Sequence, residues 1–167
     1  MLGFSCKYDH MPDGLYERDI LIWSEHQADL LRRLGRGERV NDVDWAYVAE
    51  EIEDLGLSEL HAVESYLTLI LVHLLKIQAS PDNDAVDHRY EEIAAFQGNA
   101  RRRFTPSMRQ RLDLGALYAD AIRQTRIGDR RNKTPRPWPE TNPFSLDQLL
   151  NGDPDDLVRG LPAANPT

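Results

Sequence analysis

The most apolar stretch of the chain, residues 66–78, reads YLTLILVHLLKIQ and carries two groups that can do chemistry, His73 and Lys76. An imidazole can serve as a general acid or base or as a metal ligand, so a carboxylate beside His73 would make a functional pair. The simpler interpretation is that the helix meets water here. His73 would then form a hydrogen bond with a backbone carbonyl or a carboxylate, and the positive charge of Lys76 would interact favourably with the negative C-terminal end of the helix dipole.

A second group of polar residues is the acidic run AEEIEDL, residues 49–55. Carboxylates three residues apart share a helix face, and four-helix di-iron proteins combine such glutamates with histidines in Glu-x-x-His motifs. None of the five histidines stands three residues after a glutamate, so the sequence predicts neither a metal nor a cofactor. A solvated helix face is the simpler interpretation of this run. Its polar candidates are Glu50, Glu51 and Glu53.

The third candidate is a basic segment, residues 101–136, which holds 11 basic and 3 acidic side chains. Arginines and lysines at this density can neutralise the phosphates of nucleic acid. However, these arginines fall on several faces of two expected helices, and the whole chain has a net charge of −8. Residues 1–83 hold 7 basic and 16 acidic side chains, which offers the arginines an acidic partner in the same chain or in another subunit. Nucleic acid is therefore not the expected partner.

The elements that must position these groups are helices, because apolar residues recur every three or four positions almost throughout the chain. The sequence predicts an all-α fold, a single-domain bundle over residues 15–150 with five main helices and a short C-terminal helix. Residues 1–14 and 151–167 are expected to be flexible tails, and the proline-rich, basic residues 129–144 an extended connection. The expected helices cover about residues 16–34, 44–56, 58–79, 85–104 and 105–128, and the short helix begins at Ser145.

Residues 58–79 are expected to form the central helix, because the second half of this segment is apolar nearly all round. A two-residue turn at Gly56 would make an antiparallel hairpin of this helix and the one before it. In that hairpin Glu53 lies opposite residues near His61, and His73 lies about 18 Å further along the helix. The partner of His73 must then come from another helix or another subunit. The face of residues 44–56 that is expected to lie inside consists of Trp45, Val48, Ala49, Ile52 and Leu55.

Length and composition limit the class of protein. The 167 residues suffice for one domain with its own core. The longest apolar run is about half of what a membrane span needs, and the N-terminus lacks the charged and then apolar pattern of a secretory signal. The single cysteine, Cys6, cannot form an intramolecular disulfide, so a reduced, cytoplasmic setting without a membrane is expected. Nucleophile-elbow, Walker and dinucleotide-binding motifs do not occur in the sequence.

Five segments occur in a distinctive order: YERDILIW (16–23), DWAYVAEEIEDLGLSE (44–59), LTLILVHLLKIQASP (67–81), TPSM (105–108) and NPFSLDQLL (142–150). Together they resemble the domain of unknown function 29 family, which consists of small bacterial α-helical proteins. The resemblance implies an all-α fold and a bacterial source, and it implies no activity. It also implies that the characteristic polar positions of the family are the five candidates already named, Glu50, Glu51, Glu53, His73 and Lys76.

The chain departs from this family pattern in the expected fourth helix. Members usually show a tryptophan and a glutamine-arginine pair there, whereas this chain has Tyr90 and a Gln97 that no arginine follows directly. A site that needs that arginine would be incomplete in this chain.

We expect a small, soluble helical protein that works through protein–protein contact, either by self-association or by binding another protein. The grounds are the missing catalytic motifs, the two-sided charge distribution and a proline-rich arm suited to lie across another surface. The first alternative is an enzyme or metal-binding protein that uses the helix carboxylates together with His73. The second alternative is nucleic-acid binding through residues 101–136.

Overall fold

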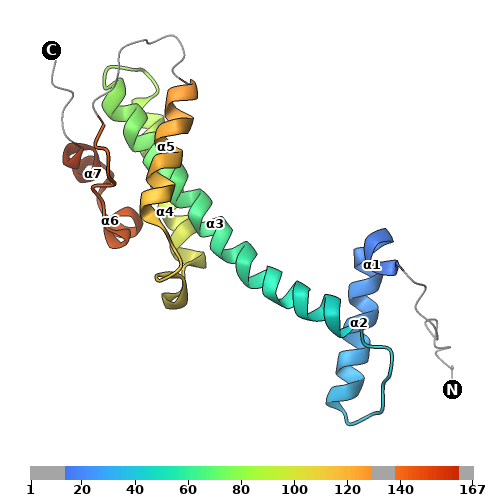
Figure 1. The fold of residues 1–167 in the computed structure, drawn as a ribbon. Coiled ribbons are helices and arrows are strands. Elements are labelled where there is room, and N and C mark those ends of the chain that lie inside the picture. The colour runs from blue at the N-terminus through green and yellow to red at the C-terminus, as the bar shows by residue number, and fades with distance from the viewer. Residues whose placement is uncertain (1–13, 129–137, 162–167) are drawn as a thin grey trace. The chain divides into compact units, whose positions relative to one another are not determined.

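The computed structural model describes residues 14–128 and 138–161, and within these ranges it contains helices and loops but no strand (Figure 1). The predicted all-α class is confirmed. The expected N-terminal tail and most of the proline-rich connection lie outside the described residues. The helices are α1 (Leu15–Arg18), α2 (Ile20–Gly35), α3 (Trp45–Ala79), α4 (Val86–Arg103), the 3₁₀ turn η1 (Pro106–Met108), α5 (Leu114–Gly128), α6 (Leu146–Asn151) and α7 (Pro154–Gly160).

The chain divides into two compact units, residues 1–56 and 57–167, where the sequence predicted a single domain. α3 contributes its first part to the N-terminal unit and its remainder to the C-terminal unit. The buried residues of the main hydrophobic cluster all come from the C-terminal unit. The N-terminal unit therefore has a small core of its own.

α3 runs without interruption from Trp45 to Ala79, so the predicted turn at Gly56 and the hairpin built on it are wrong. A glycine inside a helix costs about 1 kcal/mol relative to alanine, which a long helix can absorb when good helix formers stand on both sides. No heavy atom lies within 4 Å of the position that a Cβ of Gly56 would take. Packing therefore does not require this glycine, and Ser58 lies inside the helix rather than capping it.

In the N-terminal unit, α1, α2 and the start of α3 pack through aromatic rings. Tyr16 stacks on Tyr47 with ring centroids 4.0 Å apart, and it meets Trp23 edge-on at 5.0 Å. Asp19 caps α2, because its carboxylate accepts a hydrogen bond from the N–H of Ile22 at 3.1 Å. The buried hydrophobic side chains of this unit, within residues 14–56, are Trp23, Leu30 and Val48.

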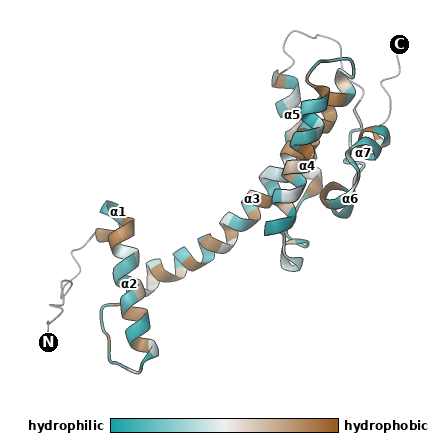
Figure 2. Cartoon of the chain, turned by 180° about the vertical axis from the view of Figure 1, so that it is seen from behind, coloured by the Kyte–Doolittle hydropathy of each residue, from teal (hydrophilic) through white to brown (hydrophobic). Residues whose placement is uncertain are grey.

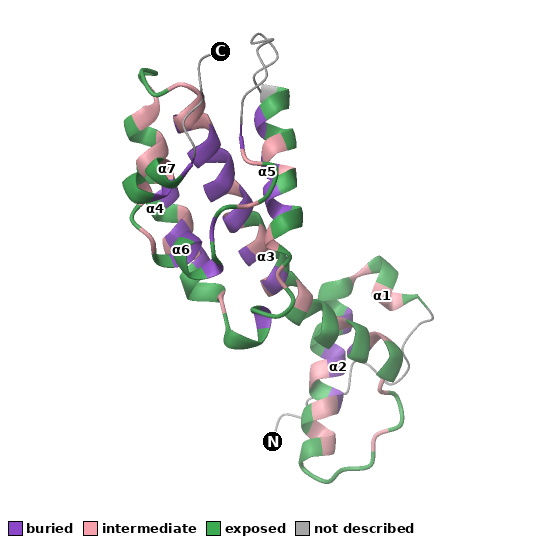
Figure 3. Cartoon of the chain, turned by 60° about the vertical axis from the view of Figure 1, so that its left-hand side comes forward, coloured by how far each residue is buried: buried purple, intermediate pink, exposed green. Residues whose placement is uncertain are grey.

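In the C-terminal unit α3 is the central helix, as the sequence predicted (Figure 3). Residues from α4, α5, α6 and α7 join its buried cluster. Among the described helices α3 alone is long and apolar enough to cross a membrane, but 56% of its most apolar 18-residue window is buried inside the protein, as in the core helix of a folded unit. The buried residues of its predicted seam are Leu60, Val63, Leu67, Ile70, Leu74 and Ile77.

The predicted helix over residues 105–128 is divided in two. Pro106–Met108 form only a 3₁₀ turn, and α5 begins at Leu114. Asp113 precedes α5 and accepts a hydrogen bond from the N–H of Ala116 at 3.0 Å, which is the contact of a helix N-cap. The Thr-Pro signal therefore starts a turn, and the aspartate starts the helix.

The residues after 150, which were expected to be a flexible tail, form the helix α7 as far as residue 160. Asp153 caps this helix by accepting hydrogen bonds from two backbone N–H groups, and Pro154 occupies its first turn. Leu157 and Leu161 are buried against the rest of the unit. The tail prediction is therefore wrong for residues 151–161, and residues 162–167 lie outside the described ranges.

Two polar side chains of α4 hold the C-terminal end of α6. The amide of Gln97 donates to the carbonyl oxygens of Leu149 at 3.1 Å and Gly152 at 2.9 Å, and Arg101 donates to the carbonyl oxygen of Leu150 at 2.6 Å. Carbonyls at a helix end lack partners within the helix, so these bonds complete α6. Gln97 and Arg101 of α4 thus have a structural role. They are four residues apart, whereas the family pattern has a glutamine followed directly by an arginine.

Candidate functional site

His73 lies at the interface of α3 and α4, where its partner is a carboxylate of α4. Its Nδ1 is 3.1 Å from Oε2 of Glu92, which is an ion-pair distance, although the orientation does not meet hydrogen-bond geometry. Phe96 of the same helix meets the imidazole edge-on, with ring centroids 5.6 Å apart. Only 9% of His73 is exposed. The histidine is therefore a buried interface residue with a carboxylate close to one nitrogen.

The carboxylate of Glu92 also faces a second histidine. Its Oε1 is 3.6 Å from Nε2 of His88, and Nδ1 of His88 is 3.7 Å from the carboxylate of Glu91. His88 is exposed, unlike His73. One carboxylate thus stands between a buried and an exposed imidazole, an arrangement that can hold or pass a proton. Among residues 14–128 and 138–161, no three histidine, cysteine or acidic side chains are grouped so as to hold a metal ion.

The electrostatics of His73 favour the neutral ring. Burial has the largest effect and lowers its pKa below the ordinary value of 6.5; Glu92 opposes burial with a smaller effect, and Lys76, Arg89 and His88 each lower the pKa a little further. Lys76 stands in the last turn of α3, where a positive charge suits the helix dipole. Both sequence candidates therefore lie near the end of the core helix, and neutral His73 has the protonation state of a base or ligand.

The carboxylate candidates occupy a different unit. Glu51 accepts a hydrogen bond of 2.6 Å from the hydroxyl of Tyr16, and this bond is the main reason that the pKa of Tyr16 rises to about 12. Glu50 and Glu53 are exposed, as the interpretation of a solvated face predicted. The described contacts of these glutamates lie within the N-terminal unit and do not bring them to His73. The pairing of the glutamate run with His73 thus has no support in the described contacts.

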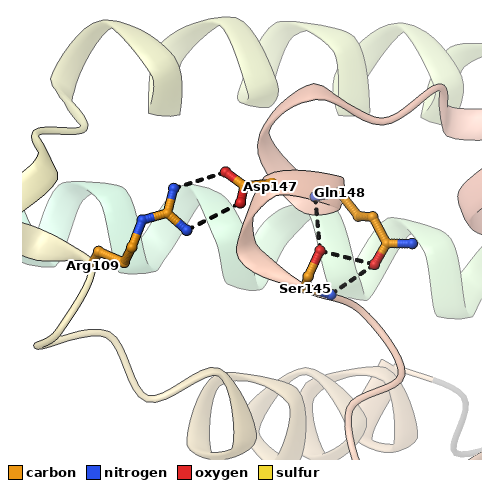
Figure 4. A network of polar contacts seen from close by, with 4 residues as sticks. All are labelled: Arg109, Ser145, Asp147 and Gln148. Carbon is orange, nitrogen blue, oxygen red and sulfur yellow. Dashed lines mark hydrogen bonds and ion pairs between the residues drawn. The ribbon is translucent and has the colours of Figure 1, made fainter.

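The arginines of the basic segment mostly form contacts within the C-terminal unit, as far as residue 126. Arg109 donates two hydrogen bonds of 2.8 and 3.1 Å to Asp147, beside the Ser145 cap of α6 (Figure 4). Arg103 donates bonds of 2.7 and 2.9 Å to Glu59, and Arg123 pairs with Asp120. Among the ion pairs of these arginines with described residues, that of Arg103 alone involves the acidic first half of the chain. Residues 130–136 of the segment lie outside the described ranges.

The apolar face of residues 44–56 is exposed, so its predicted place inside the protein is wrong for most of its members. Trp45 is 63% exposed, Ile52 66% and Leu55 69%, and only Val48 is buried. The reason is that α2 and Tyr16 meet α3 on the neighbouring face, through Tyr47 and Glu51. The side chains of Trp45, Ile52 and Leu55 are therefore left uncovered by the described residues of the N-terminal unit, 14–56.

Sequence reasoning missed the carboxylate that pairs with His73. Glu91 and Glu92 follow His88 at spacings of three and four, so this cluster was visible as a pattern along one helix. The contact between Glu92 and His73 depends on how α4 is rotated against α3, which no local spacing reports. An open groove between α3 and α5, lined in part by Glu64 and Asp120, was missed for the same reason.

Comparisons with known proteins agree with this fold. A family model described as "Domain of unknown function DUF29" matches residues 15–153. The chain is similar to an α-helical protein of unknown function from Rhodospirillum rubrum, whose crystal structure matches with a TM-score of 0.67 and 27% sequence identity over 90% of this chain and 98% of that chain. No curated protein matches the sequence.

Proposed function

The chain belongs to the DUF29 family, whose description names no activity, and we propose that it works through protein–protein contact by self-association at the N-terminal unit. The observation that carries this proposal is the distribution of exposed apolar side chains. Seven large hydrophobic residues are exposed in the described parts of the chain, and six of them belong to the N-terminal unit. They are Ile20, Leu21, Ile22, Trp45, Ile52 and Leu55, and the seventh is Ile127.

Three of these side chains form an apolar face on α3. Trp45, Ile52 and Leu55 are spaced seven and three residues apart, which places them on one side of the helix. The start of α2 exposes three consecutive apolar residues of its own, coloured brown in Figure 2. Exposed apolar residues that recur at helical spacing mark an interaction surface, whereas single exposed ones are ordinary.

The small core of the N-terminal unit supports a second copy as the occupant of this face. Three hydrophobic residues are buried between residues 14 and 56, and so few contribute little stability to a unit of this size. Small domains usually compensate with disulfides, metals or oligomerisation, and the single cysteine excludes an intramolecular disulfide. Self-association brings the same apolar face from another molecule and needs no further component.

The exposed area also fits an interface between two copies. Trp45, Ile52 and Leu55 are each 63 to 69% exposed. Side chains of these types leave roughly 400 to 500 Å² of surface open at such fractions, about half of the ~800 Å² that each partner buries in a standard interface. The face can therefore form the centre of an interface with a polar rim around it.

The alternatives have weaker support. Three of the seven arginines between residues 101 and 128 pair with carboxylates of the same unit, and Arg101 and Arg102 donate hydrogen bonds to other oxygens of that unit, which leaves fewer groups for nucleic-acid phosphates. An enzyme built on the glutamates and His73 would need groups whose described contacts lie in separate units. We also propose a soluble, cytoplasmic and bacterial protein, in keeping with the lone cysteine and the largely buried apolar part of α3.

Sedimentation velocity or native mass spectrometry of the full chain tests self-association. We expect wild-type protein at micromolar concentration to have twice the monomer mass of 19.2 kDa. Ile52→Glu should give the monomer, because it places a charge in the apolar face of both copies and should raise the dissociation constant at least ~100-fold. Ile127→Glu is the matched control, since Ile127 is 60% exposed in the other unit.

Two results would contradict the proposal. One is wild-type protein that stays monomeric up to about 100 μM, a concentration at which even weak specific dimers form. The other is an Ile127→Glu variant that dissociates as readily as Ile52→Glu. A hetero-complex with a different protein, seen with monomeric wild-type protein, would point to another occupant of the same face.

A further inference from the structure

An open groove lies between α3 and α5 in the C-terminal unit, and its lining residues are different from those proposed for self-association. Its volume is about 440 Å³, within the range of sites for small molecules. α3 supplies Glu64, Ser65 and Thr68, and α5 supplies Asp120. All of these residues belong to one unit, so the groove is complete within one copy of the chain.

Four of the six polar residues of the groove, Glu64, Ser65, Thr68 and Asp120, can only accept hydrogen bonds from a ligand, whereas His61 and Gln124 can also donate. The hydroxyl of Ser65 donates to the carbonyl oxygen of His61 at 2.8 Å, and the hydroxyl of Thr68 donates to the carbonyl oxygen of Glu64 at 2.9 Å. A hydroxyl has a single hydrogen, so both oxygens can offer only lone pairs to a ligand. The carboxylates of Glu64 and Asp120 add further acceptors.

The charge of the groove is negative and only partly compensated. Asp120 pairs with Arg123, whereas the carboxylate of Glu64 makes no ion pair with another described residue. Two leucines, Leu69 and Leu117, line the groove between the polar groups. A ligand that fits these surroundings has several N–H donors, a positive charge and a short apolar part.

We propose that this groove binds a small aliphatic amine or guanidine. The cationic N–H groups bond the carboxylates of Glu64 and Asp120, because charge-assisted hydrogen bonds are the strongest available here. The methylene groups cover Leu69 and Leu117. Small anions are disfavoured, since the open carboxylate of Glu64 repels them. This inference does not rest on self-association.

Titration with agmatine, which carries an amine and a guanidinium on a four-carbon chain, tests the proposal by calorimetry on the full chain. We expect saturable binding at one site per chain, with malate as the anionic probe giving none. Glu64→Gln should weaken agmatine binding about tenfold, the effect of losing one charge-assisted bond. Glu53→Gln is the matched control, because it removes the same charge from an exposed position of the same helix and should leave the affinity unchanged.

Three outcomes would overturn the proposal. The first is no saturable binding of agmatine below about 10 mM. The second is equal weakening by Glu53→Gln and Glu64→Gln, which would make the effect one of net charge. The third is binding of malate with similar affinity. Repeating the titration on monomeric Ile52→Glu separates this site from self-association, since the groove should bind agmatine equally well there.

Discussion

Replacing Gln97 with methionine is the sharpest test of how the C-terminal unit is held together. Gln97 is 5% exposed, and its amide donates two hydrogen bonds to carbonyls at the end of α6. Methionine keeps the length and approximate volume of the side chain but has no donor. Each carbonyl that loses its partner in a buried setting costs about 1 to 2 kcal/mol, so the free energy of unfolding should fall by about 2 to 4 kcal/mol.

In a chain of this length such a loss lowers the melting temperature by about 5 to 15 °C. Thermal and urea denaturation followed by circular dichroism measure it, and hydrogen exchange at the amides of α6 shows whether that helix opens first. Gln110→Met is the matched control, because Gln110 is exposed in the same unit. A Gln97→Met protein within ~0.5 kcal/mol of wild type, or no more affected than the control, would refute the claim that these bonds fasten α6.

Three further predictions concern single side chains. Burial lowers the pKa of His73 below 6.5, so as pH falls this histidine is protonated in the unfolded chain before it is protonated in the folded chain. The neutral ring therefore contributes fully to the free energy of unfolding above about pH 6.5, and this contribution is lost as the pH falls below 6.5. His73→Leu should flatten this decline in urea denaturation between pH 8 and pH 5, and parallel profiles would contradict it. Gly152→Ala should lower the melting temperature, because the new Cβ would come 2.5 Å from a backbone carbonyl oxygen of α6. Gly56→Ala should instead stabilise the protein by up to about 1 kcal/mol, because the new Cβ would point into open space and alanine favours the helix. In a spectrophotometric titration Tyr16 should ionise near pH 12, and Glu51→Gln should return the pKa of Tyr16 toward 10. A Glu51→Gln titration identical to that of the wild type would rule out the hydrogen bond to Glu51 as the cause of the raised pKa.

The periodicity of the sequence was sufficient to predict the helical class and the central position of residues 58–79, because a seam that is apolar over about five turns must be buried against other helices. Periodicity was insufficient at Gly56. Glycine there is a local signal for the end of a helix, but the residues on both sides favour the helix strongly enough for α3 to continue through it. The helix α7 was predictable, since Asp153 followed by Pro154 is a strong helix start.

The candidate site was predictable only in part, for a different reason. The position of His73 on the flank of a core helix follows from its spacing in α3, and its burial agrees with that position. Its partner Glu92 stands 19 residues later on another helix, and the contact depends on the angle and rotation between the two helices. Likewise, Trp45, Ile52 and Leu55 share one face as predicted, but periodicity cannot tell a face that meets its own chain from one that meets another molecule.

The two units differ in how each removes apolar surface from water, and this difference determines where each perturbation should act. The main cluster of the C-terminal unit contains 22 buried residues in the described ranges, so changes such as Gln97→Met act on a unit that is stable through its own packing. Within its described residues, 14–56, the N-terminal unit buries three hydrophobic residues and exposes six large ones, so an added partner surface would contribute much of its stability. Ligands of the groove should therefore raise the stability of the C-terminal unit independently of protein concentration, whereas the stability of residues 20–55 should rise with protein concentration. Hydrogen exchange at two protein concentrations distinguishes these effects in one sample, because it reports α2 and the buried part of α3 separately.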